Sequence, residues 1–383
     1  MVNQITADEL ADRLDDGEAL ALFDTRPADS FESWHLPGAV NVPYDPREGL
    51  DQDDFQRIRD EAADGHVTAI CGKGLTSTPF AFELEDHGYV DVTVVKGGME
   101  DWGALYEAVP IETATGGLVV RQVQRRGKGC LGYVVGDERT GAAAAVDPTR
   151  RIDAVEVAAE EAGLTIERVI DTHVHADHLS GGRALADALD VPYHLGERAS
   201  ERDVTCDYEP VADGDELAVG DVILRAIDAP GHTTEMINYL VADELLLSSD
   251  TLFVESVGRT ELQFGDEGAA EGARLLYETL HEKLLALPDE TVVLPGHVSV
   301  SADNRFAHGE PGAPIRATIG DLVDDLDLLS LDEDTFVDRL TADVSAKPAN
   351  YEEIIAINAC RQSLPGTEEA AAELEIGPNN CAA

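Results

Sequence analysis

The sequence is poor in basic residues. It contains 27 lysine and arginine residues against 77 aspartate and glutamate residues, which gives a formal net charge of −50, and five of the basic residues are lysines. A surface this acidic repels a phosphate backbone, so we expect no nucleic-acid partner. The acidic residues lie between regular apolar segments rather than in tails, which favours a folded protein over a disordered one. We therefore predict an acidic, halophile-type surface whose self-repulsion is screened by concentrated salt.

The sequence also lacks long apolar runs and closely spaced cysteines. No stretch approaches 18 consecutive apolar residues, and the first residues do not form a basic segment followed by an apolar one. We therefore expect no membrane-spanning helix, no secretory signal and no membrane partner. The cysteines are odd in number and widely spaced, namely Cys71, Cys130, Cys206, Cys360 and Cys381. This spacing predicts no disulfide framework and fits a cytoplasmic protein.

Two regions of the chain differ in their pattern, and 383 residues are enough for two domains. Residues 1–112 alternate short buried-strand candidates with amphipathic helical stretches, which is typical of an α/β domain with a parallel sheet. A small-residue stretch at 113–118 is the expected linker. Residues 119–383 are rich in strand candidates with interspersed helices, which suits an αββα sandwich. From about residue 310 onward we expect an acidic, helical region.

A cysteine follows the strand candidate that ends at Ile70. The glycine-rich loop from Cys71 to Thr76 (Cys-Gly-Lys-Gly-Leu-Thr) precedes a predicted helix at 77–87. Backbone N–H groups of such a loop and the helix N-terminus would point at the sulfur, and Lys73 adds positive charge. These groups would lower the pKa of the thiol and hold an anionic persulfide or thiosulfate. For the loop taken alone, an inert half-buried cysteine is an equally good interpretation.

The first region, over residues 5–110, resembles the rhodanese family. The cysteine loop is accompanied, in the family's order, by Asp-Thr-Arg at 24–26, His-Leu-Pro-Gly-Ala at 35–39 and Gly-Gly-Met-Glu-Asp-Trp at 97–102. A phosphatase of related shape would have arginine where this chain has Ser77, so phosphate-ester hydrolysis is disfavoured. The resemblance implies an active sulfurtransferase with Cys71 as nucleophile and with Lys73 and Thr76 as catalytic residues of its loop. A silent persulfide-binding or docking module is the alternative, and the presence of Cys71 argues against it.

Seven candidate metal ligands follow apolar strand candidates in the second region. They are His173, His175, Asp177, His178, His232, Asp250 and His297. These residues stand in segments that each follow a strand candidate. All of them can therefore project into one cleft at the edge of the sheets. Histidine and aspartate without cysteine suit zinc, iron or manganese. The sequence therefore predicts a metal site.

This pattern, over about 118–308, resembles the metallo-β-lactamase superfamily, whose members perform hydrolysis, oxidation and redox chemistry on one scaffold. In its persulfide dioxygenases, the equivalents of His173, His232 and Asp250 hold one ferrous iron and leave positions open for oxygen and substrate. Its glyoxalase II-like thioester hydrolases use all seven residues around two metals. The segment Val-Gly-Arg-Thr-Glu-Leu-Gln at 257–263 resembles the dioxygenases, and so do 280–288 and 347–351. One departure is the valine after His297, where both groups commonly have aspartate.

The resemblance thus implies a persulfide dioxygenase joined to a thiosulfate sulfurtransferase. The enzyme would oxidise a low-molecular-weight thiol persulfide with O₂ at one Fe(II) per chain, release sulfite, and exchange sulfur with thiosulfate through Cys71. Arg259 would steady the anionic substrate or a neighbouring loop. The four remaining candidate ligands would surround the iron and tune its ligands; these are His175, Asp177, His178 and His297. The alternative is a thioester hydrolase of the hydroxyacylglutathione hydrolase type with two zinc ions per chain. The oligomeric state stays open between a monomer and a homo-oligomer.

Overall fold

The computed structural model describes residues 2–62, 66–342, 347–375 and 382. The chain forms two compact units, of which the first comprises Met1–Leu105, Arg126–Lys128 and Val300–Arg305 and the second comprises the remainder. We expected the first domain to reach residue 112, followed by a linker at 113–118. Strand β6 (Tyr106–Ile111) instead pairs antiparallel with β7 (Leu118–Arg125) in a sheet of the second unit. The physical reason is burial, because Val109 and Ile111 are covered in that sheet.

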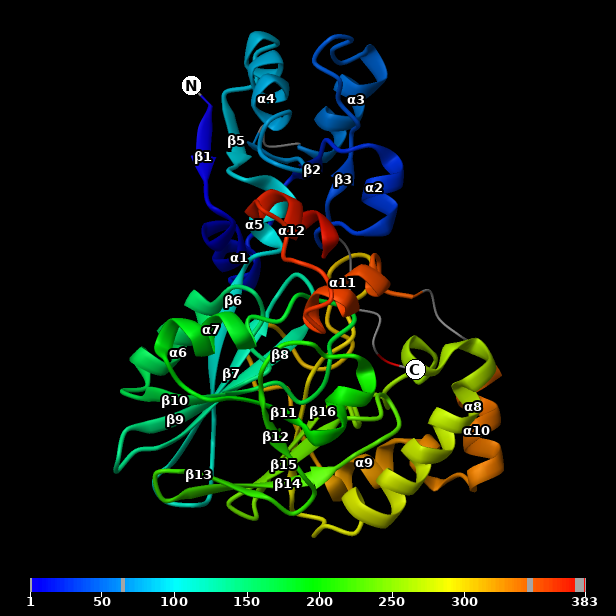
Figure 1. Cartoon of the computed structure of the whole chain (residues 1–383). Helices are drawn as coiled ribbons and strands as arrows, with labels where there is room; N and C mark the ends of the chain where they lie inside the picture. Colours follow the sequence, from blue (N-terminus) through cyan, green and yellow to red (C-terminus); the bar gives the residue numbers. More distant parts are fainter. Residues whose placement is uncertain (1, 63–65, 343–346, 376–381, 383) are drawn as a thin grey trace. The chain divides into compact units, whose positions relative to one another are not determined.

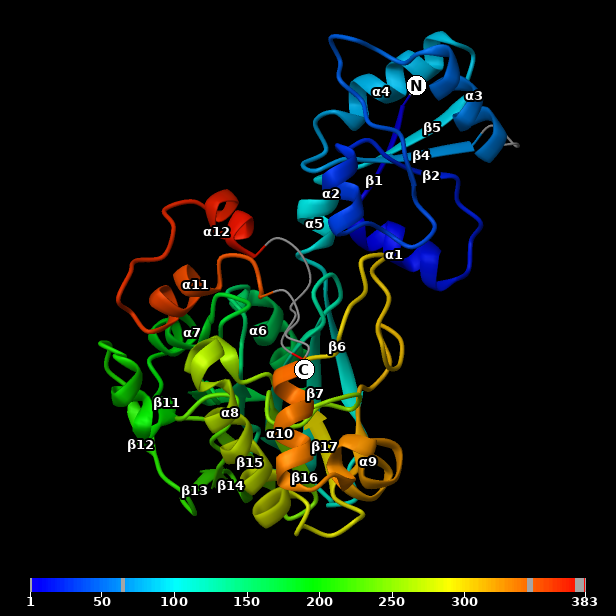
Figure 2. The same ribbon diagram turned by 90° about the vertical axis from the view of Figure 1, so that its right-hand side faces the viewer.

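The first unit contains a five-stranded parallel sheet with helices on both faces (Figure 2). Its strand order is β1-β5-β4-β2-β3, with β1 (Asn3–Ile5), β2 (Leu22–Asp24), β3 (Val40–Asn41), β4 (His66–Ile70) and β5 (Asp91–Val95). One face carries α1 (Ala7–Asp15), α2 (Ala28–Ser33) and α5 (Gly98–Trp102), and the other carries α3 (Gln52–Glu61) and α4 (Ser77–Asp86). Apolar residues line both faces, which include Leu10 and Trp102 on the first and Ile58 and Phe80 on the second. The predicted α/β fold is confirmed.

The second unit consists of two sheets that pack face to face, with helices on the outside (Figure 1). The seven-stranded sheet has the order β12-β11-β10-β9-β8-β7-β6, with β8 (Cys130–Asp137), β9 (Ala142–Val146), β10 (Thr165–Ile170), β11 (Tyr193–Gly196) and β12 (Glu209–Val211). The six-stranded sheet runs β13 (Glu216–Val219), β14 (Val222–Asp228), β15 (Ile237–Val241), β16 (Leu245–Ser249), β17 (Val292–Pro295) and β18 (Ala317–Thr318). Side chains from both sheets share one core, among them Val135, Ala144, Leu224 and Tyr239.

Helices cover the outer face of each sheet in the second unit. The seven-stranded sheet is covered by α6 (Ile152–Glu161) and α7 (Gly182–Leu189), and the six-stranded sheet by α8 (Glu261–Thr279), α9 (Ile319–Asp325) and α10 (Glu333–Ala342). Shorter helical turns are 3-10 turns at Glu197–Arg202 and Asp327–Ser330 and a π-helical turn at Leu280–Leu284. This arrangement confirms the predicted αββα sandwich. Within the described ranges, no helix combines the length and apolarity that a bilayer-spanning segment needs.

The last described segment packs beside α7 (Figure 2). It contains α11 (Tyr351–Asn358) and α12 (Glu368–Leu374), whose apolar residues Ile354, Ile357 and Ala371 contact Leu179. A disulfide joins Cys206 to Cys360, two residues that lie 154 positions apart in the sequence. The cysteine spacing predicted no disulfide framework, and this prediction missed the Cys206–Cys360 bond. Sequence spacing could not reveal this pair, because only the folded chain brings the two cysteines together.

Candidate functional site

The first unit places Cys71 between the end of β4 and the start of α4. The side chain is 1% exposed, and its Sγ lies 3.4 Å from Ser77 Oγ. Burial raises the pKa of the Cys71 thiol, but hydrogen bonds from the side chains and backbone of Ser77 and Thr76 lower it, and the net shift is downward. A thiol of lowered pKa at a helix N-terminus ionises readily and becomes a nucleophile. This geometry suits sulfur chemistry at Cys71.

The Gly-Gly segment at 97–98 supports the back of the cysteine loop. Gly98 has φ +65°, and a Cβ on it would stand 2.1 Å from the carbonyl oxygen of Cys71. That oxygen accepts a hydrogen bond from Met99 N at 2.8 Å. Of the predicted loop residues, Thr76 bonds to Cys71, whereas Lys73 lies at the surface with its Nζ 3.9 Å from Glu100 Oε2. The closing motif therefore fixes the loop's backbone.

Four strand ends of the second unit bring the predicted metal ligands together. His173 follows β10, His232 follows β14, Asp250 follows β16 and His297 follows β17. All seven predicted ligands are at most 2% exposed. Strands β9 and β10 are parallel, as are β16 and β17, so their carboxyl ends lie at the same edge of each sheet. The sandwich thus gathers separate segments into one buried cluster.

Three of these residues, His173, His232 and Asp250, point their ligand atoms at one place. The Nε2 atoms of His173 and His232 lie 3.9 and 3.7 Å from Asp250 Oδ2. All three atoms fall within 4.8 Å of one another. Among the described residues, neither His173 Nε2 nor Asp250 Oδ2 has a hydrogen-bond partner. Because buried polar atoms without partners are costly, this convergence fits a metal ion held by two histidines and one carboxylate.

Hydrogen bonds on the outer side hold this trio in the ligating form. His232 Nδ1 donates to the carbonyl oxygen of Arg259 at 2.6 Å, which leaves the lone pair on Nε2. Thr172 Oγ1 donates to Asp147 and accepts from His173 Nδ1 at 3.0 Å. Burial lowers the pKa of both His173 and His232, so these rings stay neutral. Burial raises the pKa of Asp250, but its charge interaction and hydrogen bond with His297 lower it. The net pKa lies below the ordinary value, so the carboxyl stays ionised.

The other four predicted ligands are Asp177 and three histidines, each of which contacts a carboxylate. His297 Nδ1 lies 2.6 Å from Asp250 Oδ1, and His297 Nε2 lies 2.9 Å from Asp177 Oδ2. His178 Nδ1 lies 3.0 Å from Asp177 Oδ1, and His175 Nε2 lies 3.3 Å from Asp147 Oδ1. Two ring nitrogens of this set, His178 Nε2 and His175 Nδ1, have no hydrogen-bond partner among the described residues. The seven residues therefore divide into a trio that converges on one point and a second set in which each histidine also contacts a carboxylate.

Cys130 is a site residue that the sequence reasoning missed. Its Sγ lies 3.5 Å from Asp177 Oδ2, and with Asp177, His178 and His297 it forms a second group that could hold a metal ion. Burial and Asp177 raise the pKa of the Cys130 thiol, but His178 and His297 lower it, and the net value is about 7. A cysteine at the start of an apolar strand gives no signal by itself. Only the bridge between Cys130 and His297 in the fold places it here.

Arg259 and the C-terminal segment act on the cluster through the backbone. The guanidinium of Arg259 is buried and paired with Glu261, so the part of Arg259 that faces the trio is its carbonyl oxygen. Asn358 Nδ2 donates to the carbonyl oxygens of His175 and His178 at 2.9 and 2.8 Å. Glu375 Oε1 accepts from Leu179 N at 2.7 Å. No motif in this acidic helical region indicated that it contacts the loop of the predicted ligands.

Comparison with known proteins identifies both units. Residues 6–105 match the rhodanese-like domain family, and residues 129–297 match the metallo-beta-lactamase superfamily. The chain is 30% identical over 190 residues to the mitochondrial persulfide dioxygenase ETHE1 of Bos taurus, which covers 48% of this chain and 70% of the relative. It is 31% identical over 177 residues to a hydroxyacylglutathione hydrolase of Brucella anthropi, which covers 46% of this chain and 64% of that relative.

A solved structure agrees with this assignment. The crystal structure of ETHE1 from Myxococcus xanthus matches with a TM-score of 0.54 and 28% sequence identity, over 63% of this chain and 99% of that one. The family predictions made from the motifs are thereby confirmed. The chain belongs to the metallo-beta-lactamase superfamily and carries a rhodanese-like domain in front of the metallo-beta-lactamase fold.

Proposed function

We propose that this protein is a persulfide dioxygenase with an active sulfurtransferase module. The reaction at the metal centre is RSSH + O₂ + H₂O → RSH + H₂SO₃, in which R is a low-molecular-weight thiol scaffold. One ferrous iron per chain is held by His173, His232 and Asp250, a ligand set typical of non-haem iron oxygenases. The relatives named as persulfide dioxygenases support this assignment at about 30% identity.

The observation that carries the proposal is the division of the seven buried residues. In the trio, His173 Nε2 and Asp250 Oδ2 converge and have no hydrogen-bond partner among the described residues. His178 Nε2 of the second set also has none there. In the second set, Asp177 is hydrogen-bonded to both His178 and His297. A two-metal hydrolase requires the second set as ligands as well, whereas a mononuclear centre leaves it as the hydrogen-bonded surround.

When bound, ferrous iron supplies the redox chemistry that joins O₂ to the sulfane sulfur. The chain's own residues orient the ligands and exclude water. His297 hydrogen-bonds to both Asp250 and Asp177, so it fixes the orientation of the Asp250 carboxylate in the trio. The carbonyl of Arg259 fixes the ring of His232, and the Thr172 hydroxyl fixes His173. The burial of all these groups strengthens their mutual electrostatic interactions.

In the first unit, the Cys71 thiolate takes the outer sulfur of thiosulfate and releases sulfite: Cys–S⁻ + S₂O₃²⁻ → Cys–SS⁻ + SO₃²⁻. A low-molecular-weight thiol then removes that sulfur as its own persulfide and regenerates the thiolate. The Ser77 and Thr76 hydrogen bonds that lower the pKa of Cys71 also stabilise the anion that carries the sulfur. This activity would produce the substrate class that the metal centre oxidises.

The direct test is oxygen consumption by the full chain. Protein purified anaerobically and loaded with Fe(II) should consume one O₂ and form one sulfite per thiol persulfide supplied. Zinc-loaded protein should do neither. Fe(II) protein that consumes no oxygen with glutathione, cysteine or coenzyme A persulfides would contradict the proposal.

A second candidate function is a dinuclear zinc thioester hydrolase. It is favoured by the second group of ligands, Cys130, Asp177, His178 and His297, whose atoms lie within 4.8 Å of one another, and by the hydroxyacylglutathione hydrolase relative. In that case zinc-loaded protein should hydrolyse a glutathione thioester. The same two preparations therefore separate both candidates.

A further inference from the structure

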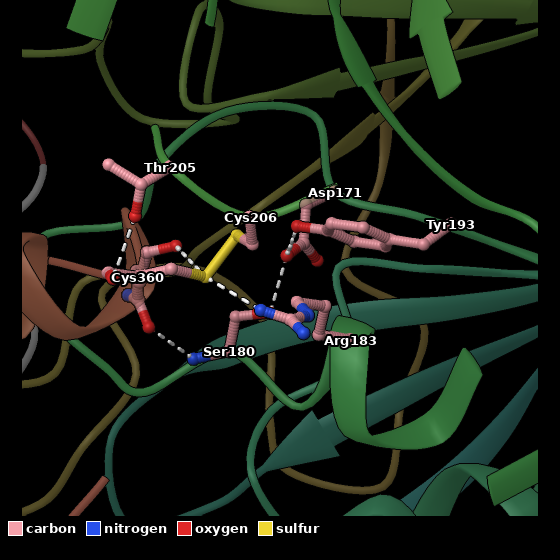
Figure 3. Close-up of a disulfide and its surroundings, with 8 residues drawn as sticks. Asp171, Ser180, Arg183, Tyr193, Thr205, Cys206 and Cys360 are labelled. Carbon is pink, nitrogen blue, oxygen red and sulfur yellow. Dashed lines mark hydrogen bonds between the residues drawn. A yellow bond between two sulfur atoms is a disulfide. The ribbon is translucent and has the colours of Figure 1, made fainter. Parts of the chain in front are cut away.

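The Cys206–Cys360 disulfide lies at the base of the C-terminal segment (Figure 3). Both cysteines are partly exposed. Hydrogen bonds from Thr205 accompany the sulfur bond, from its backbone N to the carbonyl of Ala359 at 3.1 Å and from its Oγ1 to the carbonyl of Cys360 at 2.8 Å. The disulfide therefore fastens the residues just after α11 to the loop around Cys206.

This fastened stretch holds the loop that carries the metal ligands. Asn358, two residues before Cys360, donates to the carbonyl oxygens of His175 and His178, and its Oδ1 accepts from Ser180 N at 3.0 Å. One side chain thus fixes three backbone groups of the ligand loop. Hydrogen bonds around a metal site orient its ligands. If Asn358 lost its hydrogen bonds to this loop, the site would therefore hold a metal ion less tightly.

A cavity of about 470 Å³ opens beside the disulfide. Its lining includes Cys360 and three charged residues, of which Arg183 and Arg361 are basic and Asp187 is acidic. Arg183 Nη1 lies 3.1 Å from Cys360 Sγ, as Figure 3 shows. A guanidinium beside a disulfide sulfur attracts an incoming thiolate, which is the reactive form in thiol–disulfide exchange. In a chain with a net charge of −50, this basic spot is where a small anionic thiol can approach.

We propose that this cavity is a thiol-exchange site, at which a small anionic thiol reduces the Cys206–Cys360 bond. Reduction thereby weakens the hydrogen bonds of Asn358 to the loop that carries the candidate metal ligands. The incoming thiolate bonds to Cys360 Sγ, the protein disulfide breaks, and Cys206 leaves as a thiolate that takes a proton from water. A second thiol molecule then attacks the bound thiol's sulfur, which releases the small-molecule disulfide and frees Cys360. Two thiols are oxidised for each protein disulfide reduced. The inference does not depend on which reaction the metal centre performs.

The exchange step is tested by the rate of disulfide reduction in full-length protein with Cys381→Ser as the background. Mercaptoacetate serves as the anionic thiol and 2-mercaptoethanol as the neutral one, at low salt. Arg183→Gln should slow reduction by mercaptoacetate about fivefold, the scale of one charge lost at about 4 Å in water, with less than a twofold effect on the neutral thiol. Arg274→Gln, which removes an exposed arginine on α8, is the matched control and should change neither rate. Equal slowing of both thiols, or none, overturns the site.

The attacked sulfur is tested with Cys206→Ser. In this variant the protein disulfide cannot form, so the oxidised small thiol should leave its adduct on Cys360, as read by mass spectrometry of the digested chain. Arg183→Gln in the same chain should reduce the yield of that adduct. An adduct yield at Cys360 that does not depend on Arg183 overturns the assigned direction of attack.

The consequence for the metal is tested by the rate at which Zn²⁺-loaded protein releases its ion to a chromophoric chelator. Reduced protein and the Cys206→Ser/Cys360→Ser variant should both release zinc about tenfold faster than oxidised protein, the scale of losing an outer hydrogen-bond partner. Asn358→Ala should release it fast in both redox states. Reduction of the parent chain needs no substitution, so the test survives a variant that fails to fold. Equal release rates from the oxidised and reduced parent chain overturn the proposal.

Discussion

The cysteine loop of the first unit and the metal cluster of the second are built in opposite ways. The cysteine loop is a contiguous stretch of six residues between one strand and one helix, supported by a single Gly-Gly segment. The metal cluster draws on four strand ends of the sandwich and is held from outside by Asn358 and Glu375. Local backbone therefore positions Cys71, whereas long-range packing positions the candidate metal ligands.

The largest expected effect is the loss of sulfurtransfer in Cys71→Ser. A serine hydroxyl is not ionised at neutral pH, so thiosulfate-to-cyanide transfer should fall by about a thousandfold or more. Metal content should stay at the parent level, because the cysteine and the ligands belong to different units. The measurement is thiocyanate formation alongside metal analysis. An unchanged rate of sulfurtransfer would show that Cys71 is not the nucleophile.

The next-largest effect is a difference in iron affinity, which distinguishes the trio of His173, His232 and Asp250 from the second set of candidate ligands. Asp250→Ala removes the only carboxylate of the trio, so iron affinity should fall by more than about 100-fold. Asp177→Ala removes a hydrogen-bond partner of His297 and His178 but no member of the trio, and should cost about tenfold. Competition with a chelator measures both affinities. Equal losses in the two variants would favour a two-metal site.

A smaller effect concerns the pH dependence of Cys71. Its pKa lies below that of an ordinary cysteine, so its alkylation rate should rise with pH and level off at a lower pH than that of a model thiol. Ser77→Ala removes a hydrogen bond that stabilises the thiolate, and should slow alkylation about fivefold at pH 7. Iodoacetamide labelling followed by mass spectrometry gives the rate at this residue. A Ser77→Ala rate equal to that of the parent would show that the hydroxyl does not stabilise the thiolate.

Salt should change the activity at both sites together, because it acts on the folding of the protein. Screening length falls from about 10 Å at 0.1 M to about 3 Å at 1 M, which relieves the repulsion within a chain of net charge −50. We expect the unfolding midpoint to rise by roughly 10 °C between 0.1 and 2 M KCl, equivalent to ~4 kcal/mol in a domain of this size. NaCl should raise the unfolding midpoint to a similar extent. A thermal melt that is flat across this range would show that the acidic residues are no adaptation to salt.

Much of the fold could be predicted because its strands are short apolar runs that end in glycine or polar residues. Leu245–Ser249, for example, is buried throughout, and Val292–Pro295 is buried after its first residue; both are predicted as strands without any tertiary information. The boundary between the units was harder to predict from the sequence. Tyr106–Ile111 follows the first unit without a break in composition, and only its pairing with β7 assigns it to the second.

The clustering of the candidate metal ligands could be predicted because they follow strands in recognisable motifs, but their division into two sets could not. Whether His175 turns toward the trio or toward Asp147 depends on side-chain packing across the cluster. Cys130, Asn358 and the Cys206–Cys360 pair carry no local signal either. Each acquires its contact from a segment more than 45 residues away, as the 47 positions between Cys130 and Asp177 illustrate.

The most direct test of the central claim is the metal stoichiometry of the full chain, titrated anaerobically with Fe(II). A mononuclear centre at His173, His232 and Asp250 predicts one tightly bound iron per chain in the parent and in Asp177→Ala, and none in Asp250→Ala. It also predicts that this single iron is sufficient for oxygen consumption with a thiol persulfide. Two tightly bound metals per chain, with oxygen consumption absent and thioester hydrolysis present, would contradict the account.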